Sequence, residues 1–434
     1  MVHFSGFARK MNHIPLSHAS EASIRLIVRH LKDCLKHKTK PNLVKSLFRE
    51  KNMKYLNSVL ETVGNTPLIR LHRVVSDVPA LVLAKVETYN PGLSIKDRIA
   101  VRIIEEAERT GKLRAGSTIV ECTSGNTGIG LAMVAAVKGY KIICTVNDKQ
   151  SKEKIQMLRS WGAEVIICPS KVRPEDPRSN YSVAEQISKD LPNSYWVNQY
   201  ENPMNPFAHY ESTGPEIWTA TEGKVTHIVA PTGTGGSLCG TARYLKEQNP
   251  QIKVWGVDAY GSILKKFHET GIFDEKEIYD YSMEGVGREF IPRSMNLDLI
   301  DRFEKVSDKD AALMGRRLVR EEGLWLGHSS GSAVSAIKQL RHLLKPSDVV
   351  VVICHDHGSR YIGKIYNDDW MRSKGFLDEQ KETHSRKPVG ELVEDMQELQ
   401  PSATPARTNF WRESTEKTRF LYKILRGLFK PSSL

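Results

Sequence analysis

The chain has 434 residues, of which 40% are hydrophobic, and a formal net charge of +12. This length allows about two to three domains, and no apolar run reaches the roughly 20 residues that span a bilayer. Residues 1–54 carry +9 and residues 407–434 carry +5, so residues 55–406 carry −2. A nearly neutral body argues against nucleic-acid binding.

Six cysteines are scattered along the chain without a Cys-x-x-Cys pair. This pattern argues against a zinc site and against a disulfide framework, so we expect no metal and a reducing, cytoplasmic environment.

Residues 1–54 are predicted to form a basic helical extension. Its apolar residues repeat at helical spacing on one face: Ile24, Ile27, Val28, Leu31 and Leu35. A basic, acid-poor start is also typical of transit peptides, which would make the location mitochondrial. A docking helix is the interpretation that we favour.

The next 320 or so residues alternate between strand-like and helix-like runs, which predicts an α/β fold with parallel sheets covered by helices. A turn at Gly64-Asn65-Thr66-Pro67 delivers the first strand. The further strand-like runs are Leu81–Val86, Ile119–Val120, Lys141–Val146, Glu164–Cys168, Thr226–Ala230, Val254–Asp258 and Val349–Cys354.

The pattern ends after Asp378. Residues 379–409 are polar, with Pro388, Pro401 and Pro405, and are predicted to be a linker. Residues 410–434 have the composition of a basic amphipathic helix. Such a helix suits a peripheral contact with an anionic membrane or with a protein.

Lys96 stands at a loop-to-helix junction. It follows Asn90-Pro91-Gly92-Leu93-Ser94-Ile95, and a helical apolar pattern starts behind it. The positive end of a helix disfavours the ammonium form, so Lys96 is suited to act as a neutral amine that forms a Schiff base with an aldehyde cofactor. Taken alone, the residue also fits an ordinary surface lysine.

Two glycine-rich loops, Thr123–Gly128 and Thr232–Ser237, each follow a strand-like run and precede a helical one. The second is suited to cradle a phosphate. Together with the Lys96 segment, these loops resemble fold-type II pyridoxal-phosphate (PLP) enzymes, specifically cysteine synthases and cystathionine β-synthases, over residues 57–377. The resemblance implies a homodimer of the tryptophan synthase β-like type. Each subunit would have a catalytic core at 55–378 made of two three-layer domains, the smaller covering about 91–200.

The resemblance also implies a role for each matching residue. Lys96 is expected to hold PLP as an imine and to remove the substrate α-proton; Asn126 to bond the ring hydroxyl oxygen; and Ser329 to face the ring nitrogen. The expected phosphate cup is Gly233, Thr234, Gly235, Gly236 and Ser237. The expected substrate-binding residues are Thr123, Ser124, Thr127, Gln199, Tyr200, Gly285 and Arg288, although the first two also fit helix N-caps and Gln199 a strand-end amide.

A serine at the ring nitrogen is neutral, so it does not hold the ring protonated. Such a ring suits β-elimination to an aminoacrylate, followed by addition of a nucleophile, which is β-replacement on serine or an activated serine. Asn198-Gln199-Tyr200, Gly261-Ser262-Ile263-Leu264 and Glu284-Gly285-Val286-Gly287 resemble cystathionine β-synthase most. This favours serine plus homocysteine in transsulfuration, with Tyr200 and Glu284 near the second substrate.

Three residues depart from the family pattern. Leu93 and His328 stand where glycines are usual, and Arg288 stands where the vertebrate enzymes have tyrosine. Positive charge from Arg288 and His328 near the mouth would suit an anionic partner. A cysteine synthase or cysteate synthase that joins O-acetylserine or O-phosphoserine to sulfide or sulfite is therefore an alternative. A PLP-binding scaffold without turnover is another.

Two regulatory features of some cystathionine β-synthases are not expected. Cys34 and His37 lack the context of the haem-binding motif, so we predict no haem. The roughly 57 residues after Leu377 are too few for the nucleotide-binding modules that respond to S-adenosylmethionine.

Overall fold

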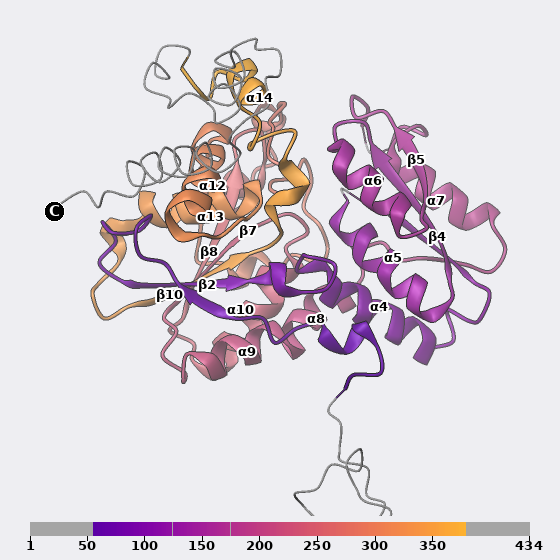
Figure 1. The fold of residues 1–434 in the computed structure, drawn as a ribbon, viewed down its shortest axis with the longest axis horizontal. Helices are drawn as coiled ribbons and strands as arrows, with labels where there is room; N and C mark the ends of the chain where they lie inside the picture. The colour runs from indigo at the N-terminus through magenta and orange to yellow at the C-terminus, as the bar shows by residue number, and fades with distance from the viewer. Residues whose placement is uncertain (1–54, 124, 174, 379–434) are drawn as a thin grey trace, which may run out of the picture. The chain divides into compact units, whose positions relative to one another are not determined.

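The computed structural model describes residues 55–378, except Ser124 and Pro174 (Figure 1). The helices predicted near both termini, the polar linker, and the Cys34 and His37 pair lie outside the described residues. Described residues up to Asn367 belong to one compact unit, and helix α14 (Asp368–Ser373) belongs to a second. None of the helices in the described part has the length and apolar character to cross a bilayer.

The larger sheet has six strands in the order β1-β2-β10-β7-β8-β9. All neighbours are parallel except β1, which is antiparallel to β2. The strands are β1 (Leu68–Arg70), β2 (Leu81–Val86), β7 (His227–Pro231), β8 (Lys253–Ala259), β9 (Arg302–Val306) and β10 (Val349–Cys354). The predicted parallel α/β architecture is confirmed.

The smaller sheet is parallel throughout, with the order β5-β4-β3-β6. Its strands are β3 (Thr118–Cys122), β4 (Lys141–Asn147), β5 (Glu164–Cys168) and β6 (Ser194–Trp196). All four lie within residues 91–200, the range expected for a smaller domain.

Helices connect the strands. They are α4 (Lys96–Arg109), α5 (Asn126–Lys138), α6 (Lys152–Ser160), α7 (Asn180–Asp190), α8 (Met204–Glu211), α9 (Thr213–Ala220), α10 (Gly236–Gln248), α11 (Leu264–Thr270), α12 (Asp308–Glu322) and α13 (His328–Gln339). Short 3-10 turns are η2 (Val59–Thr62), η3 (Glu87–Tyr89), η4 (Glu275–Glu277), η5 (Leu297–Leu299), η6 (Arg341–Leu343) and η7 (Gly358–Tyr361).

Strand β10 shows how the larger sheet is buried on both faces. Successive side chains of a strand point to opposite faces. Val350 and Val352 accordingly join an apolar cluster that includes residues of α12 and α13, whereas Val351 and Ile353 join a cluster that includes residues of α10. In Figure 1, α12 and α13 lie on one side of this sheet and α8, α9 and α10 on the other. A continuous apolar strand is what two covered faces require.

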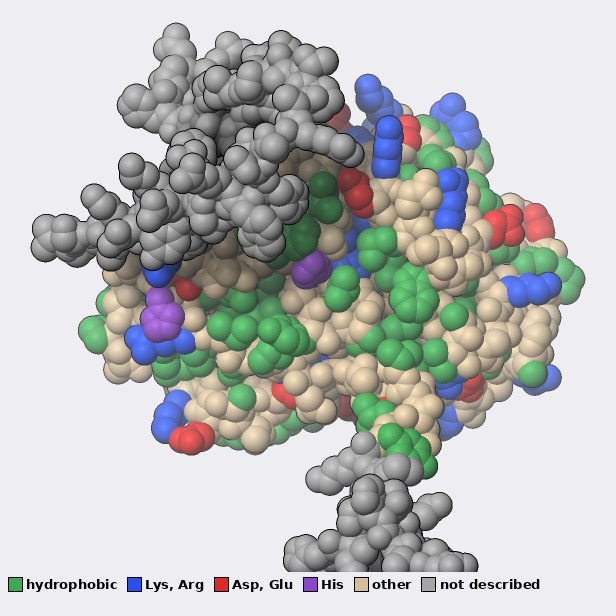
Figure 2. Space-filling view, viewed as in Figure 1, with side chains coloured by type: hydrophobic (Ala, Val, Ile, Leu, Met, Phe, Trp, Pro, Cys, Tyr) green, Lys and Arg blue, Asp and Glu red, His purple; other side chains and the backbone are tan. Residues whose placement is uncertain are grey.

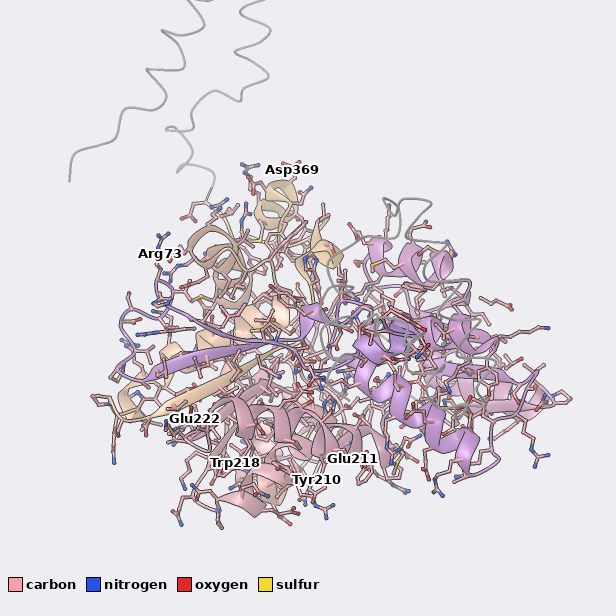
Figure 3. The ribbon with its side chains drawn as sticks, turned by 60° about the horizontal axis from the view of Figure 1, so that its bottom comes forward. Arg73, Tyr210, Glu211, Trp218, Glu222 and Asp369 are labelled. Atoms are coloured by element: carbon pink, nitrogen blue, oxygen red, sulfur yellow. The ribbon has the colours of Figure 1, made fainter. Side chains whose placement is uncertain are left out.

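The smaller sheet has its own apolar core. Ile119 of β3 and Val146 of β4 pack with Ile99 and Ile103 of α4 and with Ile129 of α5. The apolar spacing that predicted a helix behind Lys96 therefore marks the face of α4 that is buried. A surface ion pair, Arg102–Glu211 at 2.8 Å, also joins α4 to the end of α8, where Figure 3 labels Glu211.

The surface of the described residues has mixed charge. On the face shown in Figure 2, most basic and acidic side chains lie toward the periphery and hydrophobic side chains gather over the middle.

Candidate active site

Lys96 is the first residue of α4, as its sequence context predicted. The loop before it is tightly held. The Asp97 carboxylate accepts a hydrogen bond from the Gly92 N–H at 2.6 Å, and the Arg360 guanidinium donates to the carbonyls of Gly92 and Leu93. Leu93 has φ +59°, in the left-handed region. Glycine adopts this conformation without strain, which explains why a glycine is usual at this position.

The start of α4 is anchored by a buried ionic cluster next to Lys96. Arg98 pairs with Glu87 at 2.8 Å and with Glu216 at 2.6 Å, and Lys85 pairs with Glu216 at 2.6 Å. Two cations and two anions balance one another within this cluster, as buried charges require. It fixes the direction in which Lys96 leaves the backbone.

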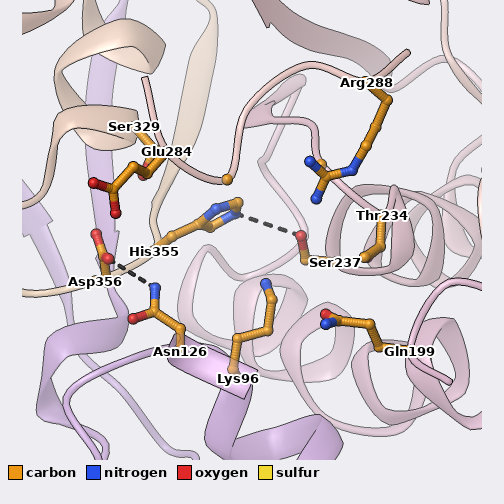
Figure 4. A pocket seen from close by; sticks show the side chains of 12 residues that line it. Lys96, Asn126, Gln199, Thr234, Ser237, Glu284, Arg288, Ser329, His355 and Asp356 are labelled. Atoms are coloured by element: carbon orange, nitrogen blue, oxygen red, sulfur yellow. Dashed lines mark hydrogen bonds between the residues drawn. The ribbon is translucent and has the colours of Figure 1, made fainter. Parts of the chain in front are cut away.

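The Lys96 side chain points into a cavity and makes no hydrogen bond or ion pair in the described part of the chain (Figure 4). Burial lowers the pKa of Lys96 to about 8; the charge of Asp356 opposes this shift and that of Arg288 adds to it. A substantial fraction of the amine is therefore neutral near physiological pH, as a nucleophilic amine must be.

Asn126 is the first residue of α5 and lines the same cavity. Its Nδ2 donates to Asp356 Oδ2 at 2.7 Å, and the Tyr361 hydroxyl donates to the same carboxylate at 2.7 Å. Asn126 Oδ1 and Asp356 Oδ1 are buried, and neither has a hydrogen-bond partner among the described residues. Orphaned polar atoms at a cavity wall indicate a ligand that completes their hydrogen bonds.

The loop Gly233–Ser237 forms another wall, and Gly233, Thr234 and Ser237 line the cavity. Gly235 has φ +81°, and α10 starts at Gly236. A Cβ on Gly236 would lie 2.0 Å from Asn205 Oδ1, so only glycine permits this close approach. The first N–H groups of a helix have no intrahelical partners and favour an anion, so this loop fits a phosphate.

Ser329, the second residue of α13, also lines the cavity, and its hydroxyl makes no hydrogen bond within the described residues. The structure therefore brings Lys96, Asn126, the glycine loop and Ser329 together, each at or beside a helix start. These four convergent helix ends favour an anionic ligand. The glycine cradle, free amine and orphaned amide oxygen fit PLP, which carries a phosphate, an aldehyde and a polar ring.

The residues expected to bind the substrate divide into two layers. Gln199 lines the cavity, whereas Thr123 and Thr127 are not among its described lining residues. The Thr127 hydroxyl donates to Gln199 Oε1 at 2.7 Å, and Thr123 Oγ1 accepts from the N–H groups of Gly125 and Gly128. Thr123 thus caps the loop, and Thr127 fixes the orientation of the Gln199 amide. Ser124 lies outside the described residues.

Gly285 and Arg288 line the cavity from a loop of the larger-sheet half. The Arg288 guanidinium lies 5.3 Å from the centre of the Tyr200 ring, a cation–π contact. Tyr200 itself is not among the lining residues; it packs edge-on against Phe290.

Glu284 lines the cavity beside Gly285 and is held by two lysines. Lys154 of α6 lies 2.5 Å from one carboxylate oxygen, and Lys364 contacts the other. Burial raises the pKa of Glu284, but the two lysines outweigh burial and leave the pKa below its usual value. The Lys154–Glu284 pair joins the half built on the smaller sheet to the half built on the larger one.

One expectation about charge at the mouth is wrong. His328 is 2% exposed and is absent from the described lining of the cavity. Its Nε2 lies 3.0 Å from the Asp308 carbonyl, and burial lowers the pKa of the imidazole. His328 is therefore neutral and adds no positive charge, whereas Arg288 does.

His355 and Asp356 were not singled out from the sequence. They directly follow β10 and line the cavity; His355 Nε2 lies 3.4 Å from Ser237 Oγ. Burial holds the pKa of His355 well below its usual value, so this imidazole is neutral. The signal was present, because ligands of open α/β sheets bind at the carboxyl ends of the strands.

Comparison with known proteins agrees with this geometry. The family described as "Pyridoxal-phosphate dependent enzyme" matches residues 59–356. Cystathionine beta-synthase of Dictyostelium discoideum is 40% identical over 357 residues, which are 81% of this chain and 71% of that protein. Cysteine synthase 1 of Emericella nidulans is 39% identical over 324 residues, 74% of this chain and 87% of that protein.

A solved structure is also similar. The O-acetylserine dependent cystathionine beta-synthase of Helicobacter pylori aligns with a TM-score of 0.66 and 37% identity, over 73% of this chain and 100% of that one. By contrast, the chain spans between 59% and 71% of the length of six cystathionine beta-synthases from Dictyostelium, mammals, honey bee and yeast.

Proposed function

The chain belongs to the pyridoxal-phosphate-dependent enzymes, and we propose that it catalyses β-replacement, joining serine to homocysteine to give cystathionine. The observation that carries this proposal is the convergence of Lys96, Asn126, Ser329 and the glycine loop on one cavity. Several relatives at about 40% identity over three quarters or more of this chain are cystathionine beta-synthases, which supports the choice of acceptor.

Each residue has a place in holding the cofactor. Lys96 would hold it covalently through its side-chain amine, the loop Gly233–Ser237 would bind the phosphate, Asn126 the ring oxygen and Ser329 the ring nitrogen. Bound PLP supplies an aldehyde that links to amines and a ring that takes up the electron pair released at the substrate Cα.

Lys96 is the proposed base and acid of the reaction. With the substrate in place, the free Lys96 amine would take the proton from the substrate Cα. The resulting ammonium can then protonate the departing hydroxyl, so that it leaves as water. A pKa of about 8 suits both duties near neutral pH, since neither protonation state is strongly favoured.

The remaining groups orient the substrate and set the electronics of the site. Gln199, fixed by Thr127, would bind the substrate carboxylate near the start of α5. Ser329 presents a hydroxyl to the ring nitrogen and not a carboxylate, so it gives no electrostatic support to protonation of that nitrogen. This favours rapid loss of the β-substituent.

A matrix of donors and acceptors tests the proposal. Serine, O-acetylserine and O-phosphoserine are each paired with homocysteine, sulfide and sulfite, and kcat/KM is measured for every pair. We expect serine with homocysteine to have the highest value. A clear preference for sulfide or sulfite would instead assign cysteine synthase or cysteate synthase activity. Absence of turnover with all nine pairs would favour a PLP-binding scaffold.

A second candidate, a reaction with an anionic partner, is favoured by Arg288, whose guanidinium forms no ion pair with a carboxylate among the described residues. A cytoplasmic homodimer is part of the same proposal: the family resemblance supports the dimer, and the scattered cysteines support the location. Size-exclusion chromatography with light scattering tests the dimer, since a monomeric mass for active enzyme would contradict it.

A further inference from the structure

The guanidinium of Arg288 is a partly buried cation that pairs with no anion among the described residues. It lines the cavity, and it makes no ion pair with any carboxylate in the part of the chain that the structure describes. Within that part, its Nη1 donates to the carbonyl of the neighbouring Gly287 at 3.1 Å, and its Nε is buried and has no hydrogen-bond partner. Both a buried charge and a buried donor are costly unless something pairs with them.

Neither of the two acids that line the same cavity pairs with Arg288. Glu284 pairs with Lys154 and Lys364. Asp356 Oδ2 accepts hydrogen bonds from Asn126 and Tyr361, and the charge of Asp356 acts on Lys96. Among the described residues, no ion pair therefore neutralises the Arg288 guanidinium.

Arg288 is held in position by its backbone. Its N–H donates to Ser262 Oγ at 2.8 Å, and its carbonyl accepts from the Ile263 N–H at 3.0 Å. The Gly287 N–H before it donates to the Thr232 carbonyl at 2.7 Å, which ties this segment to the strand end that leads into the glycine loop. The guanidinium also rests on the Tyr200 ring. A side chain held in this way is prepared for a ligand before the ligand arrives.

The guanidinium faces the glycine loop. A Cβ built on Gly233 would lie 3.1 Å from Arg288 Nη2, and Figure 4 shows the guanidinium directed toward Ser237 and Lys96. Oxyanions are the ligands that a guanidinium binds best, because its planar array of N–H groups matches phosphate and carboxylate.

We propose that Arg288 binds an oxyanion carried by a ligand of this cavity, either the phosphate of the cofactor or the carboxylate of the thiol acceptor. The assignment of homocysteine as that acceptor rests on the proposed function. The oxyanion chemistry itself rests on the unmatched guanidinium. Arg288 thus supplies an oxyanion contact in addition to those of the glycine loop, and it determines specificity if the oxyanion is the acceptor carboxylate.

Two measurements on the full-length holoenzyme distinguish the sources. The first is the rate at which bound cofactor absorbance is lost during dialysis. The second is the Kd of homocysteine, and of 3-aminopropanethiol, which is homocysteine without its carboxylate, from the change in cofactor absorbance. The variants are Arg288→Gln, which removes the charge, and Arg288→Lys, which keeps it but loses the planar array. Arg293→Gln is the matched control, because Arg293 is 81% exposed and lies on the same segment.

If Arg288 binds the phosphate, Arg288→Gln loses cofactor about ten- to a hundred-fold faster, Arg288→Lys loses it at an intermediate rate, and Arg293→Gln matches wild type. If it binds the carboxylate, cofactor retention is unchanged and the Kd of homocysteine rises by a similar factor while that of 3-aminopropanethiol does not. Should Arg288→Gln fail to fold, Arg288→Lys still gives both readouts.

The proposal is overturned if both variants retain cofactor normally and bind both thiols as wild type does. It is also overturned if cofactor retention is unchanged and binding of the two thiols weakens equally, because that would indicate a structural role only. Failure of the wild-type enzyme to turn over homocysteine would refute the proposed function, yet cofactor retention and thiol binding would still report on Arg288.

Discussion

Replacing Lys154 by methionine tests whether the Lys154–Glu284 pair holds the two halves of the cavity together. The two side chains are 2% and 6% exposed and lie 2.5 Å apart. Breaking a buried ion pair from one side costs about 3–5 kcal/mol, because the remaining charge stays buried without its partner. Lys364 still contacts Glu284, so we expect the lower end, about 3 kcal/mol.

The assay is thermal unfolding of the holoenzyme. At roughly 2 °C per kcal/mol for a protein of this size, Lys154→Met should lower Tm by about 6 °C. Lys149→Met is the matched control from the loop just before α6. Its partner is Asp280, and the two side chains are 45% and 77% exposed. A pair exposed to that degree contributes about 0–1 kcal/mol, so its Tm should change by 2 °C or less.

Lowering the pH gives an independent check. The pKa of Glu284 is below its usual value in the folded protein, so the stability from this pair is fully present above the unfolded pKa, near 4.5. It is lost as the pH falls through the folded pKa. The Tm difference between wild type and Lys154→Met should therefore shrink in acid. Equal Tm values at neutral pH, or a difference that grows in acid, would refute the reasoning.

Four further predictions concern Lys96, Ser329 and Leu93. Lys96→Ala should leave the circular dichroism spectrum unchanged and abolish turnover. Turnover of this variant at the wild-type rate would contradict the role assigned to Lys96. In wild-type apoenzyme the rate of PLP capture should rise about tenfold per pH unit and level off above pH 8, because the neutral Lys96 amine is the reactive form and its pKa is about 8; a rate independent of pH would count against this. Ser329→Asp should lower kcat, because a carboxylate favours a protonated ring nitrogen and an unprotonated one favours loss of the β-substituent. An unchanged kcat would contradict this role of Ser329. Leu93→Gly should raise Tm by about 2 °C. Relief of the left-handed backbone strain stabilises the folded state by about 1–2 kcal/mol, which exceeds the cost of a more flexible unfolded chain, about 0.4–1 kcal/mol. A lower Tm would show that the leucine side chain stabilises the fold through packing.

Most of the two sheets could be predicted because their strands are buried and continuously apolar. Strand β10 is an example: it is a run of valines followed by an isoleucine, and it is covered on both faces of the sheet. The strands that the sequence did not reveal are short or polar. β6 has three residues, and β9 reads Arg-Phe-Glu-Lys-Val at the edge of its sheet, where only Phe303 and Val306 are buried. An edge strand needs less apolar surface, so its periodic signal is weak.

The site could be predicted as far as it depends on motifs. Lys96, Asn126, the glycine loop and Ser329 each lie on a helix start or the loop before one, where the local sequence is distinctive. His355 and Asp356 carry no local motif, and their place depends on which strand lies next to which. The burial of His328 depends on packing against α12, which no spacing in the sequence reveals.

The electrostatics of the cavity connect these observations. Convergent helix starts and the Arg288 guanidinium create a positive field that suits a phosphate and a carboxylate. Burial above all, with the charge of Arg288 adding to it, disfavours a charged Lys96 and lowers its pKa. Asp356 opposes that shift and keeps the pKa near 8, so the amine remains basic enough to take a proton from carbon. An anionic ligand beside Arg288 would cancel part of the field and raise the pKa of Lys96, so ligand binding and proton transfer at this lysine are coupled.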